Sequence, residues 1–480
     1  MCVLRAIDVH GFAGGFTLGA AQAGFELVGK MSREVGFGVY NTLHNRHLLP
    51  GPWDSYVGKT ENGEPAPEWE VLEAEYVFGN PPCSGFSTLS PASYRGMDAS
   101  INNCMWELVR YAAAVKPEIV AWESVQQTFR QGLPLLRDLH AELEERSGHR
   151  YTLFHVLHNN AALGGVSIRK RYFWVASRIP FGVEKTTIDP YGNELTVTQV
   201  PTFGDMLRDL EPLGMSMAPQ PYRTAYCKCT PPENYEQHVC KCDGRVRVQD
   251  SSWWCEREVH DFTGLVDGHQ RLRSPSVERT LEVIDGYNET PGVEWREGER
   301  AGEVMKKYYL QYGRLPDAWD YPTWKTVDGD RVQLPKVKRL IETNFAMGHN
   351  QLTRWYWDRM ARVITGGACH LVLHPHLNRT LTQREAARIQ GFPDAWKIYP
   401  VRFAPDLGPG WGKGVPVQAG RWISHWAAQS LRESPGGYTG LPLAETHPKL
   451  ATVFGGRDRE YVIDFANDYK PLVRAIGDPG

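Results

Sequence analysis

Short apolar runs alternate with helix-like stretches through the first 180 residues, and this alternation restricts the fold more than any other feature of the chain. Runs of strand length occupy residues 3–9, 26–31, 76–79, 118–122, 151–157 and 172–176. Helical periodicity occurs between them, at residues 104–115 and 135–145. Strands that alternate with helices are typical of parallel sheets. The pattern therefore predicts an α/β fold with a doubly wound, mostly parallel sheet.

The first expected strand leads into a glycine-rich turn. Gly11, Gly14 and Gly15 follow residues 3–9, and residues 16–24 have the small-residue spacing of a helix pressed against a sheet. A strand, a glycine-rich loop and a helix in this order are typical of cofactor sites. We therefore expect a cofactor loop at this turn.

One cysteine follows the strand expected at residues 76–79. It lies in the tetrad Pro81-Pro82-Cys83-Ser84. The two prolines fix two φ angles and remove two backbone donors, so the loop that carries the thiol is stiff. An isolated cysteine is more often a small core residue than a nucleophile. A stiff loop at the mouth of a strand favours the nucleophile here.

Charged side chains lie at the ends of the next strands. Glu123 comes directly after one apolar run, and Arg169 and Arg171 open another. Open α/β sheets gather groups from successive strand ends at one edge, so with Cys83 these residues form a candidate catalytic set. Taken alone, Glu123 could cap the next helix, and the two arginines could be a solvated strand end.

Six segments resemble the DNA cytosine-5 methyltransferases and occur in that family's order. They are residues 8–16, 80–87, 123–125, 169–171, 381–394 and 412–416. Residues 381–394 match a long family signature almost residue for residue. The resemblance covers most of the chain, and it implies a class I methyltransferase-like catalytic domain with a smaller target-recognition domain.

The resemblance also implies a reaction and a partner. Cys83 would add to C6 of a cytosine, after which C5 could attack a one-carbon donor. Glu123 would protonate the ring nitrogen N3, because burial at a strand end keeps a carboxyl group protonated. Arg171 would hold the exocyclic oxygen at C2, and Arg169 a neighbouring phosphate. The expected partner is duplex DNA with the target cytosine flipped out of the stack.

The cofactor that the resemblance implies is S-adenosyl-L-methionine. The residues expected to bind it are His10, Phe12, Ala13, Gly14, Gly15, Glu34, Asp54, Pro82 and Lys413. Several positions depart from the family pattern: Phe12 stands where a glycine is usual, His10 where a phenylalanine is usual, and Lys413 where an asparagine is usual. The acidic residue after the second strand aligns with Ser32, which leaves Glu34 as an offset substitute.

These departures leave the donor open. The chain could transfer hydroxymethyl from methylenetetrahydrofolate, giving 5-hydroxymethylcytosine, or carboxymethyl from carboxy-S-adenosylmethionine, with Lys413 as a cation for an anionic donor. A tRNA cytosine-5 methyltransferase and an inactive DNA-binding relative are further alternatives. The biological setting that fits the family is restriction–modification or phage DNA modification.

The periodic pattern divides the chain. Residues 1–180 form the expected catalytic and cofactor-binding domain, and residues 181–375, rich in Pro, Gly, Trp and charge, the expected target-recognition domain. Residues 376–432 contain helical patterns at 382–390 and 417–431 that we expect to return to the catalytic domain. Residues 433–480 form an extension for which the sequence predicts no role.

Paired thiols occur in the middle domain. The four residues are Cys227, Cys229, Cys240 and Cys242. They could hold a structural zinc, or they could be free thiols, because the spacing Cys-x-Cys is less common at zinc sites than Cys-x-x-Cys.

Aromatic residues lie beside arginines at residues 354–359, and Trp253 and Trp254 form a second aromatic pair. These groups could contact DNA, although a buried aromatic cluster is the more common arrangement. Arg384 and Arg388 lie four residues apart, on one face of a helix, where we expect them to tie the recognition domain to the sheet.

Composition agrees with a large globular enzyme. The chain has 480 residues, of which 41% are hydrophobic, so it can bury a sizeable core over two or three domains. Its net charge of −3 means that DNA affinity must come from a local basic patch. No apolar run approaches the roughly 18 residues of a membrane span, and the odd count of nine cysteines favours reduced thiols, so we expect the cytosol of a bacterium or a phage-infected host.

Overall fold

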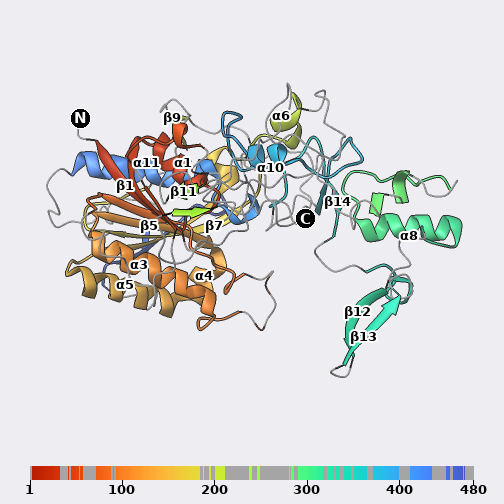
Figure 1. Cartoon of the computed structure of the whole chain (residues 1–480), viewed down its shortest axis with the longest axis horizontal. Coiled ribbons are helices and arrows are strands. Elements are labelled where there is room, and N and C mark those ends of the chain that lie inside the picture. The colour runs from red at the N-terminus through yellow and green to blue at the C-terminus, as the bar shows by residue number, and fades with distance from the viewer. Residues whose placement is uncertain are drawn as a thin grey trace.

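A single nine-stranded sheet forms the centre of the computed structural model (Figure 1). The structure describes residues 3–32, 42, 45–52, 54–57, 72–87, 90, 93, 95–183, 187–188, 194–195, 200–210, 237–239, 246–248, 280–281, 283–285, 290–316, 322–327, 330–335, 340–346, 351–364, 371–398, 411–434, 450–453, 458–468 and 470. The strand order is β16-β17-β6-β7-β5-β4-β1-β2-β3. These strands are β1 (Leu4–Val9), β2 (Phe25–Ser32), β3 (Asp54–Val57), β4 (Tyr76–Gly79), β5 (Ile119–Val125), β6 (Thr152–Asn159), β7 (Lys170–Ser177), β16 (Leu450–Thr452) and β17 (Glu460–Asp464).

The direction of β7 determines which residues meet at the end of the sheet where β5 and β6 finish. Neighbouring strands are parallel, except that β7 runs antiparallel to β5 and β6, and β16 runs antiparallel to β17. The predicted α/β fold with a mostly parallel sheet is confirmed. Because β7 is reversed, its first residues lie beside the last residues of its neighbours: Arg171 pairs with Val125 on one side and with His158 on the other.

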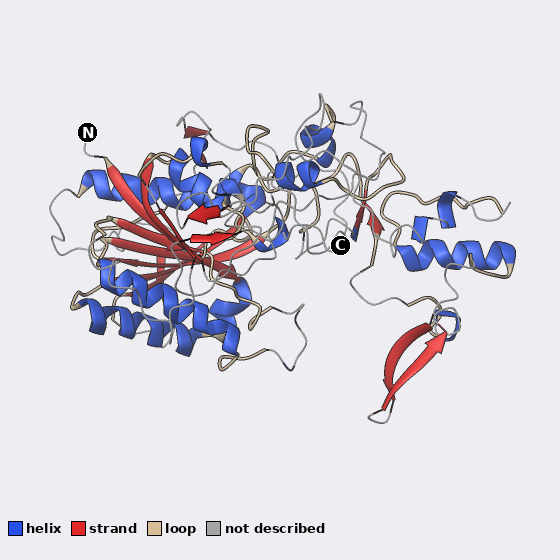
Figure 2. Ribbon diagram, viewed as in Figure 1, coloured by secondary structure: helices blue, strands red, loops and turns tan. Residues whose placement is uncertain are grey.

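Helices cover both faces of the sheet (Figure 2). In Figure 1, α1 (Gly15–Gln22) and α11 (Val417–Glu433) lie on one face, and α3 (Asn103–Val115) and α5 (Leu133–Ser147) on the other. Side chains alternate between the faces of a strand. Val77 accordingly belongs to one buried apolar cluster and Phe78 to the other.

Glycines allow α1 and α11 to pack closely. A Cβ on Gly19 would lie 2.3 Å from the backbone nitrogen of Arg421, and a Cβ on Gly420 would lie 2.8 Å from the Cα of Phe16. Any side chain at either position would force the helices apart. This close packing explains the small-residue spacing of the first helix, and it holds α11, which is distant in sequence, against the first part of the chain.

The remaining elements are shorter or lie outside the central sheet. They are η1 (Arg46–Leu48), η5 (Ser100–Asn102), α4 (Gln126–Gln131), η6 (Asn160–Leu163), β8 (Thr187–Ile188), β9 (Glu194–Leu195), α6 (Phe203–Leu207), β10 (Gln237–Val239), β11 (Val246–Val248), α8 (Ala301–Tyr312), β12 (Pro322–Val327), β13 (Asp330–Pro335), β14 (Thr353–Arg354), β15 (Val372–Leu373), α10 (Gln383–Ile389) and η9 (Trp411–Lys413). None of the helices described is both long enough and apolar enough to cross a membrane.

A third apolar cluster surrounds α8, away from the central sheet (Figure 1). Val304, Met305 and Tyr308 of α8 pack there with Leu340. The cysteines of the possible zinc site, Cys227, Cys229, Cys240 and Cys242, lie outside the described residues.

The aromatic stretch at residues 354–359 contributes to the main core. Trp355 and Trp357 are buried, and each packs edge-on against Phe203. Arg354 is also buried and donates to the carbonyl oxygens of His374 and Pro375. These contacts agree with the buried-cluster interpretation, in which the tryptophans are not available for DNA.

The arginines of α10 have structural partners. Arg384 is completely buried and donates to the carbonyl oxygen of Trp396 at 2.7 Å. Arg388 forms a two-pronged ion pair with Asp209, at 2.6 and 3.0 Å, and also pairs with Asp394. Arg388 therefore ties the segment that contains α6 to α10, whereas the link to the sheet that we expected is not among these contacts.

The C-terminal extension completes the sheet, which the sequence did not indicate. Glu460 at the start of β17 is buried and accepts from Arg137 of α5 at 2.9 Å. Its other oxygen lies 3.0 Å from Nε2 of His155, whose Nδ1 lies 2.7 Å from the Tyr172 hydroxyl. These buried polar contacts anchor β17 to β6, β7 and α5.

Candidate active site

Cys83 lies just beyond the end of β4, in the turn that the two prolines begin. Its side chain is half-buried, and its thiol is not in a disulfide. Burial raises the pKa of the Cys83 thiol, and the negative charge of Glu123 raises it further. Arg171, the backbone N–H of Val125 and the Ser124 hydroxyl act in the opposite direction. The thiolate therefore has donors and a cation ready to stabilise it, although the thiol form is favoured at rest.

Glu123 lies within β5 at the same edge and is buried. Its Oε1 is 3.1 Å from Nε of Arg171, and its Oε2 accepts from the Asn80 side-chain amide at 3.0 Å. Burial raises the pKa of Glu123, while Arg171, Arg169 and the Asn80 hydrogen bond lower it. A buried carboxyl group with a raised pKa can donate a proton to a bound base.

Asn80 is a site residue that the sequence reasoning did not identify. It is buried directly after β4 and orients the Glu123 carboxyl group. An asparagine between an apolar strand and a Pro-Pro pair was a signal that could have singled it out, because a buried amide requires a partner.

The two arginines have different surroundings. Arg171 is partly exposed and faces Glu123. Arg169 is buried, and its guanidinium donates to the carbonyl oxygens of Gly412 at 2.9 Å and Gly414 at 2.8 Å. The phosphate contact expected for Arg169 is therefore not what the structure offers, because both Nη atoms of its guanidinium donate to backbone carbonyl oxygens in the interior. Arg169 instead holds the segment at residues 412–416 against the sheet.

His158 is a second residue that the sequence reasoning missed. It is completely buried, stacks on Phe173 at 4.8 Å and faces Trp422. Burial, together with Arg171 and Arg169, lowers the pKa of His158 to about 3. The imidazole is therefore neutral and adds no further positive charge beside the two arginines.

The expected cofactor loop follows β1 and has an unusual backbone. His10 and Phe12 have φ values of 62° and 45°, and Gly14 has 90°. Positive φ is uncommon for residues other than glycine, and a bulky side chain there is strained. A phenylalanine in a left-handed conformation agrees with the prediction that glycine is the usual residue at position 12.

The cofactor loop packs against the late segment at residues 412–416. A Cβ on Gly414 would lie 3.2 Å from the Cβ of Ala13 and 3.6 Å from Cδ1 of Phe12, and a Cβ on Gly15 would lie 2.0 Å from the carbonyl oxygen of Val415. The exposed Lys413 neighbours this contact in sequence. Five of the expected cofactor residues thus lie in the loop after β1 or at the first position of α1, and Lys413 belongs to the segment packed on them.

A buried ion pair lies beneath this loop. Asp8, at 0% exposure, pairs with Lys30 and accepts from the Thr17 hydroxyl at 2.5 Å. A Cβ on Gly11 would lie 2.0 Å from the Asp8 carboxylate, so the loop passes directly over it. The carboxylate links β1, β2 and α1 under the cofactor loop, which sequence reasoning did not anticipate.

The remaining expected cofactor residues are Asp54, Glu34 and Pro82. Asp54 begins β3 and pairs with Gly29, three residues before Ser32 at the end of β2, so its backbone lies about 10 Å from the edge where the cofactor loop begins. Its side chain, and Glu34 as a whole, lie outside the described residues. Pro82 is exposed beside Cys83, next to the candidate catalytic set.

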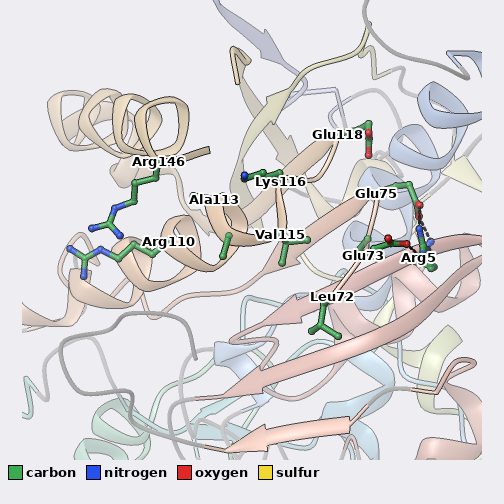
Figure 3. Close-up of a pocket in the computed structure, with 12 residues that line it drawn as sticks. Arg5, Leu72, Glu73, Glu75, Arg110, Ala113, Val115, Lys116, Glu118 and Arg146 are labelled. Carbon is green, nitrogen blue, oxygen red and sulfur yellow. Dashed lines mark hydrogen bonds and ion pairs between the residues drawn. The ribbon is translucent and has the colours of Figure 1, made fainter. Parts of the chain in front are cut away.

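A polar cavity of about 770 Å³ lies at the opposite end of the central strands, where β1 and β4 begin (Figure 3). Its lining includes Arg5, Glu73, Glu75, Arg110 and Arg146. Arg5 pairs with Glu73 at 2.9 Å and with Glu75 at 2.8 Å, so acidic groups already occupy its guanidinium. The cavity adjoins the starts of β1 and β4, and we do not assign the reaction to it.

One known protein family matches most of the chain. Residues 4–425 match the family model of the C-5 cytosine-specific DNA methylases. The chain belongs to this family. The type II methyltransferase M.FnuDI of Fusobacterium nucleatum is 24% identical over 176 residues, which are 36% of this chain and 47% of that protein. DNA (cytosine-5)-methyltransferase 1 of Mus musculus is 22% identical over 360 residues, 68% of this chain and 22% of that protein. This C-5 cytosine-specific DNA methylase family member thus spans less than half the length of each of these relatives.

Solved structures include similar chains. A DNA modification methyltransferase encoded within a prophage of E. coli has a TM-score of 0.46 at 15% identity, with 89% of this chain and 99% of that chain covered. EhMeth of Entamoeba histolytica has a TM-score of 0.44 at 10% identity, with 90% and 99% covered. These scores are too low to carry an argument, so the fold assignment of this family member rests on its own strand order.

Proposed function

We propose that the chain is a DNA cytosine-5 methyltransferase that modifies a flipped-out cytosine in duplex DNA. The observation that supports this most is the convergence of a half-buried thiol, a buried carboxyl group and a partly exposed guanidinium from three neighbouring strand ends. Glu123 and Arg171 are 3.1 Å apart, and both influence the pKa of Cys83. Acid, cation and nucleophile are the three groups that addition to a cytosine ring requires.

The reaction begins when the Cys83 thiol loses its proton and the sulfur bonds to C6 of cytosine. Electron density moves through the ring to N3, where Glu123 donates a proton. C5 becomes an enamine carbon that attacks the donor's one-carbon group, whose bond to the rest of the donor breaks with the electron pair staying on the departing donor. The C5 proton then leaves to a base, the bond between sulfur and C6 breaks to release the Cys83 thiolate, N3 returns its proton to Glu123, and the aromatic ring is restored. Arg171, beside Glu123, is placed to hold the oxygen at C2.

S-adenosyl-L-methionine is the donor that we propose, and it would supply an electrophilic methyl group when bound. The described cofactor loop fits such a group in that Gly14 has a left-handed backbone and its N–H donates to the Gly11 carbonyl oxygen at 3.1 Å, which gives a tight turn at the end of β1. The residues that would hold it are His10, Phe12, Ala13, Gly14, Gly15, Pro82 and Lys413.

A second candidate is a C5 hydroxymethyl- or carboxymethyltransferase. Methylenetetrahydrofolate or carboxy-S-adenosylmethionine would be the donor. The observation that favours it is Phe12, whose half-buried ring lies against the segment that carries the exposed Lys413, so a cation and a bulky ring replace the smaller neutral groups expected there. Lys413 would then pair with a donor carboxylate.

We also propose that residues 181–375 choose the target sequence. Cys227, Cys229, Cys240 and Cys242 would hold one zinc ion there. Zinc analysis of the full chain and of a variant with all four replaced by Ser tests this proposal. We expect the variant to lose about one zinc per chain. Equal zinc content in the two proteins would contradict the proposal.

Nucleoside mass spectrometry tests the proposed function directly. DNA and tRNA are isolated from cells that express the parent, and from cells that express Cys83→Ala as the matched control. We expect 5-methylcytosine in DNA only with the parent. 5-Hydroxymethylcytosine or 5-carboxymethylcytosine would replace the first candidate with the second. Modification of tRNA alone, or of neither nucleic acid, would overturn both.

A further inference from the structure

Three side chains of metal-ligating type meet beside the cofactor loop. His10 follows β1, and Cys104 and Glu107 lie in the first two turns of α3. One ligand atom from each residue lies within 4.8 Å of the other two, and Nε2 of His10 is 3.2 Å from Oε2 of Glu107. All three residues are buried, with exposures of 6%, 1% and 6%.

We propose that His10, Cys104 and Glu107 bind one divalent transition-metal ion, zinc by preference. Imidazole nitrogen, thiolate and carboxylate are all ligands that zinc accepts. Cys104 and Glu107 are three residues apart on the helix, so they present their side chains on the same face. A thiolate and a carboxylate together carry two negative charges, which a divalent ion neutralises. Buried charge of this kind is stable when it is paired or coordinates a metal.

The state of His10 provides an independent observation. Its Nε2 is buried, and despite its closeness to Glu107 it makes no hydrogen bond of acceptable geometry. A buried imidazole nitrogen usually has a partner, and an exception requires an explanation. A metal ion between His10, Glu107 and Cys104 supplies the missing partner.

The spacing suits a small ion after modest adjustment. Bonds of about 2.0–2.3 Å at tetrahedral angles place ligand atoms roughly 3.3–3.8 Å apart. The pair formed by His10 and Glu107 is already near that separation, so the Cys104 thiol has most of the movement to make, by about 1 Å or less. Three protein ligands leave a fourth position for water.

Such an ion would connect the cofactor loop to the helix layer. His10 has a left-handed backbone, and its N–H donates to the Met31 carbonyl oxygen at 2.8 Å. This hydrogen bond already holds the backbone of His10, so a metal ion would act on its side chain. Metal binding would fix the side chain against α3 and stabilise the strained turn at residues 10–14. The metal would then be structural for the donor pocket and would take no part in the addition of Cys83 to the base.

Metal content of the full chain tests the inference. The protein is saturated with zinc, freed of loosely bound metal and analysed by mass spectrometry, for the parent and for Cys104→Ser, Glu107→Gln and Cys83→Ser. We expect the first two variants to lose about one zinc per chain relative to the parent, whereas Cys83→Ser keeps the parent's content. Because each result is a difference from the parent, zinc held elsewhere in the chain cancels. Equal zinc content in the parent and both site variants would overturn the inference.

Cobalt absorption and hydrogen exchange provide two further measurements of the site. Cobalt substitution should give a charge-transfer band from a single thiolate, and Cys104→Ser should remove that contribution. Zinc should also slow hydrogen exchange at residues 10–14 in the parent but not in His10→Gln, which serves if Cys104→Ser fails to fold. Loss of the protection in His10→Gln supports the inference. Unchanged exchange on adding zinc to the parent, or protection that persists in His10→Gln, contradicts it.

Discussion

Replacing Glu123 with Gln should slow the reaction while making Cys83 more reactive. The carboxyl group donates the proton to N3 in the proposed mechanism, and general acid catalysis of this kind contributes about 10²–10⁴-fold in rate. Each carboxyl oxygen has one polar neighbour, Arg171 for Oε1 and Asn80 for Oε2. The neutral amide of Gln can still accept from Asn80 but loses the ion pair with Arg171, and leaving that guanidinium without its partner costs about 1–3 kcal/mol of stability.

The sign of the effect on Cys83 follows from the charges around it. The Glu123 carboxylate raises the pKa of the thiol, so removing that charge lowers the thiol pKa and increases the thiolate fraction at a given pH. At a pH above the raised pKa of Glu123, where the parent carries the carboxylate, alkylation of Cys83 by iodoacetamide should therefore be faster in Glu123→Gln. Arg171→Met is the matched control, since it removes the cation that lowers the thiol pKa, and it should alkylate more slowly than the parent.

The pH dependence gives a further readout of Glu123. Burial raises its pKa, so the protonated, active acid persists above the usual carboxyl range and is lost as pH rises through that raised pKa. This ionisation limits the rate on the alkaline side, and Glu123→Gln should abolish that limb of the profile. Single-turnover transfer to duplex DNA measures the rate, and filter binding checks that DNA affinity is retained. A loss below tenfold, or slower alkylation of Cys83, would refute the assigned role.

Two other substitutions test assignments that the structure makes or revises. Arg169→Met should destabilise the protein by about 3 kcal/mol, because it removes charge-assisted hydrogen bonds to the carbonyls of Gly412 and Gly414, and it should leave the salt dependence of DNA binding unchanged. If the slope of log DNA affinity against log salt concentration became shallower by about one, Arg169 would contact a phosphate after all. Combining Phe12→Gly with Ser32→Glu should strengthen S-adenosyl-L-methionine binding at least about tenfold in calorimetry if the donor pocket has been altered. Micromolar binding by the parent would contradict the altered-donor candidate.

Local pattern was enough to predict the central strands and the residues at their ends. The apolar run at residues 76–79 is β4 itself, and the polar residues after each run reach one edge because parallel strands end together. This rule alone brings Cys83 and Glu123 together, whereas Arg171 opens its run and would lie at the opposite end of a fully parallel sheet. Glu123 and Arg171 are 3.1 Å apart because β7 runs antiparallel to β5, a reversal that strand patterns do not reveal.

The misses depend on contacts between distant parts of the chain. The segment Glu460–Asp464 has no local sign that it will pair with β6, since that pairing is fixed by buried contacts of Glu460 with Arg137 and His155. The same holds for Arg169, whose partners lie more than 240 residues away at Gly412 and Gly414. Burial of a charged residue is set by tertiary structure, so sequence alone placed this arginine at the surface.

Covalent trapping tests the central claim most directly. Duplex DNA that contains 5-fluorocytosine at the target keeps the adduct between Cys83 and C6, because fluorine at C5 cannot leave as a proton does. The parent, saturated with its donor, should give a complex that survives denaturing electrophoresis and a DNA-linked peptide that contains Cys83. Cys83→Ser should give none. Trapping by Cys83→Ser as efficient as that of the parent, or a linkage at another residue, would contradict the account.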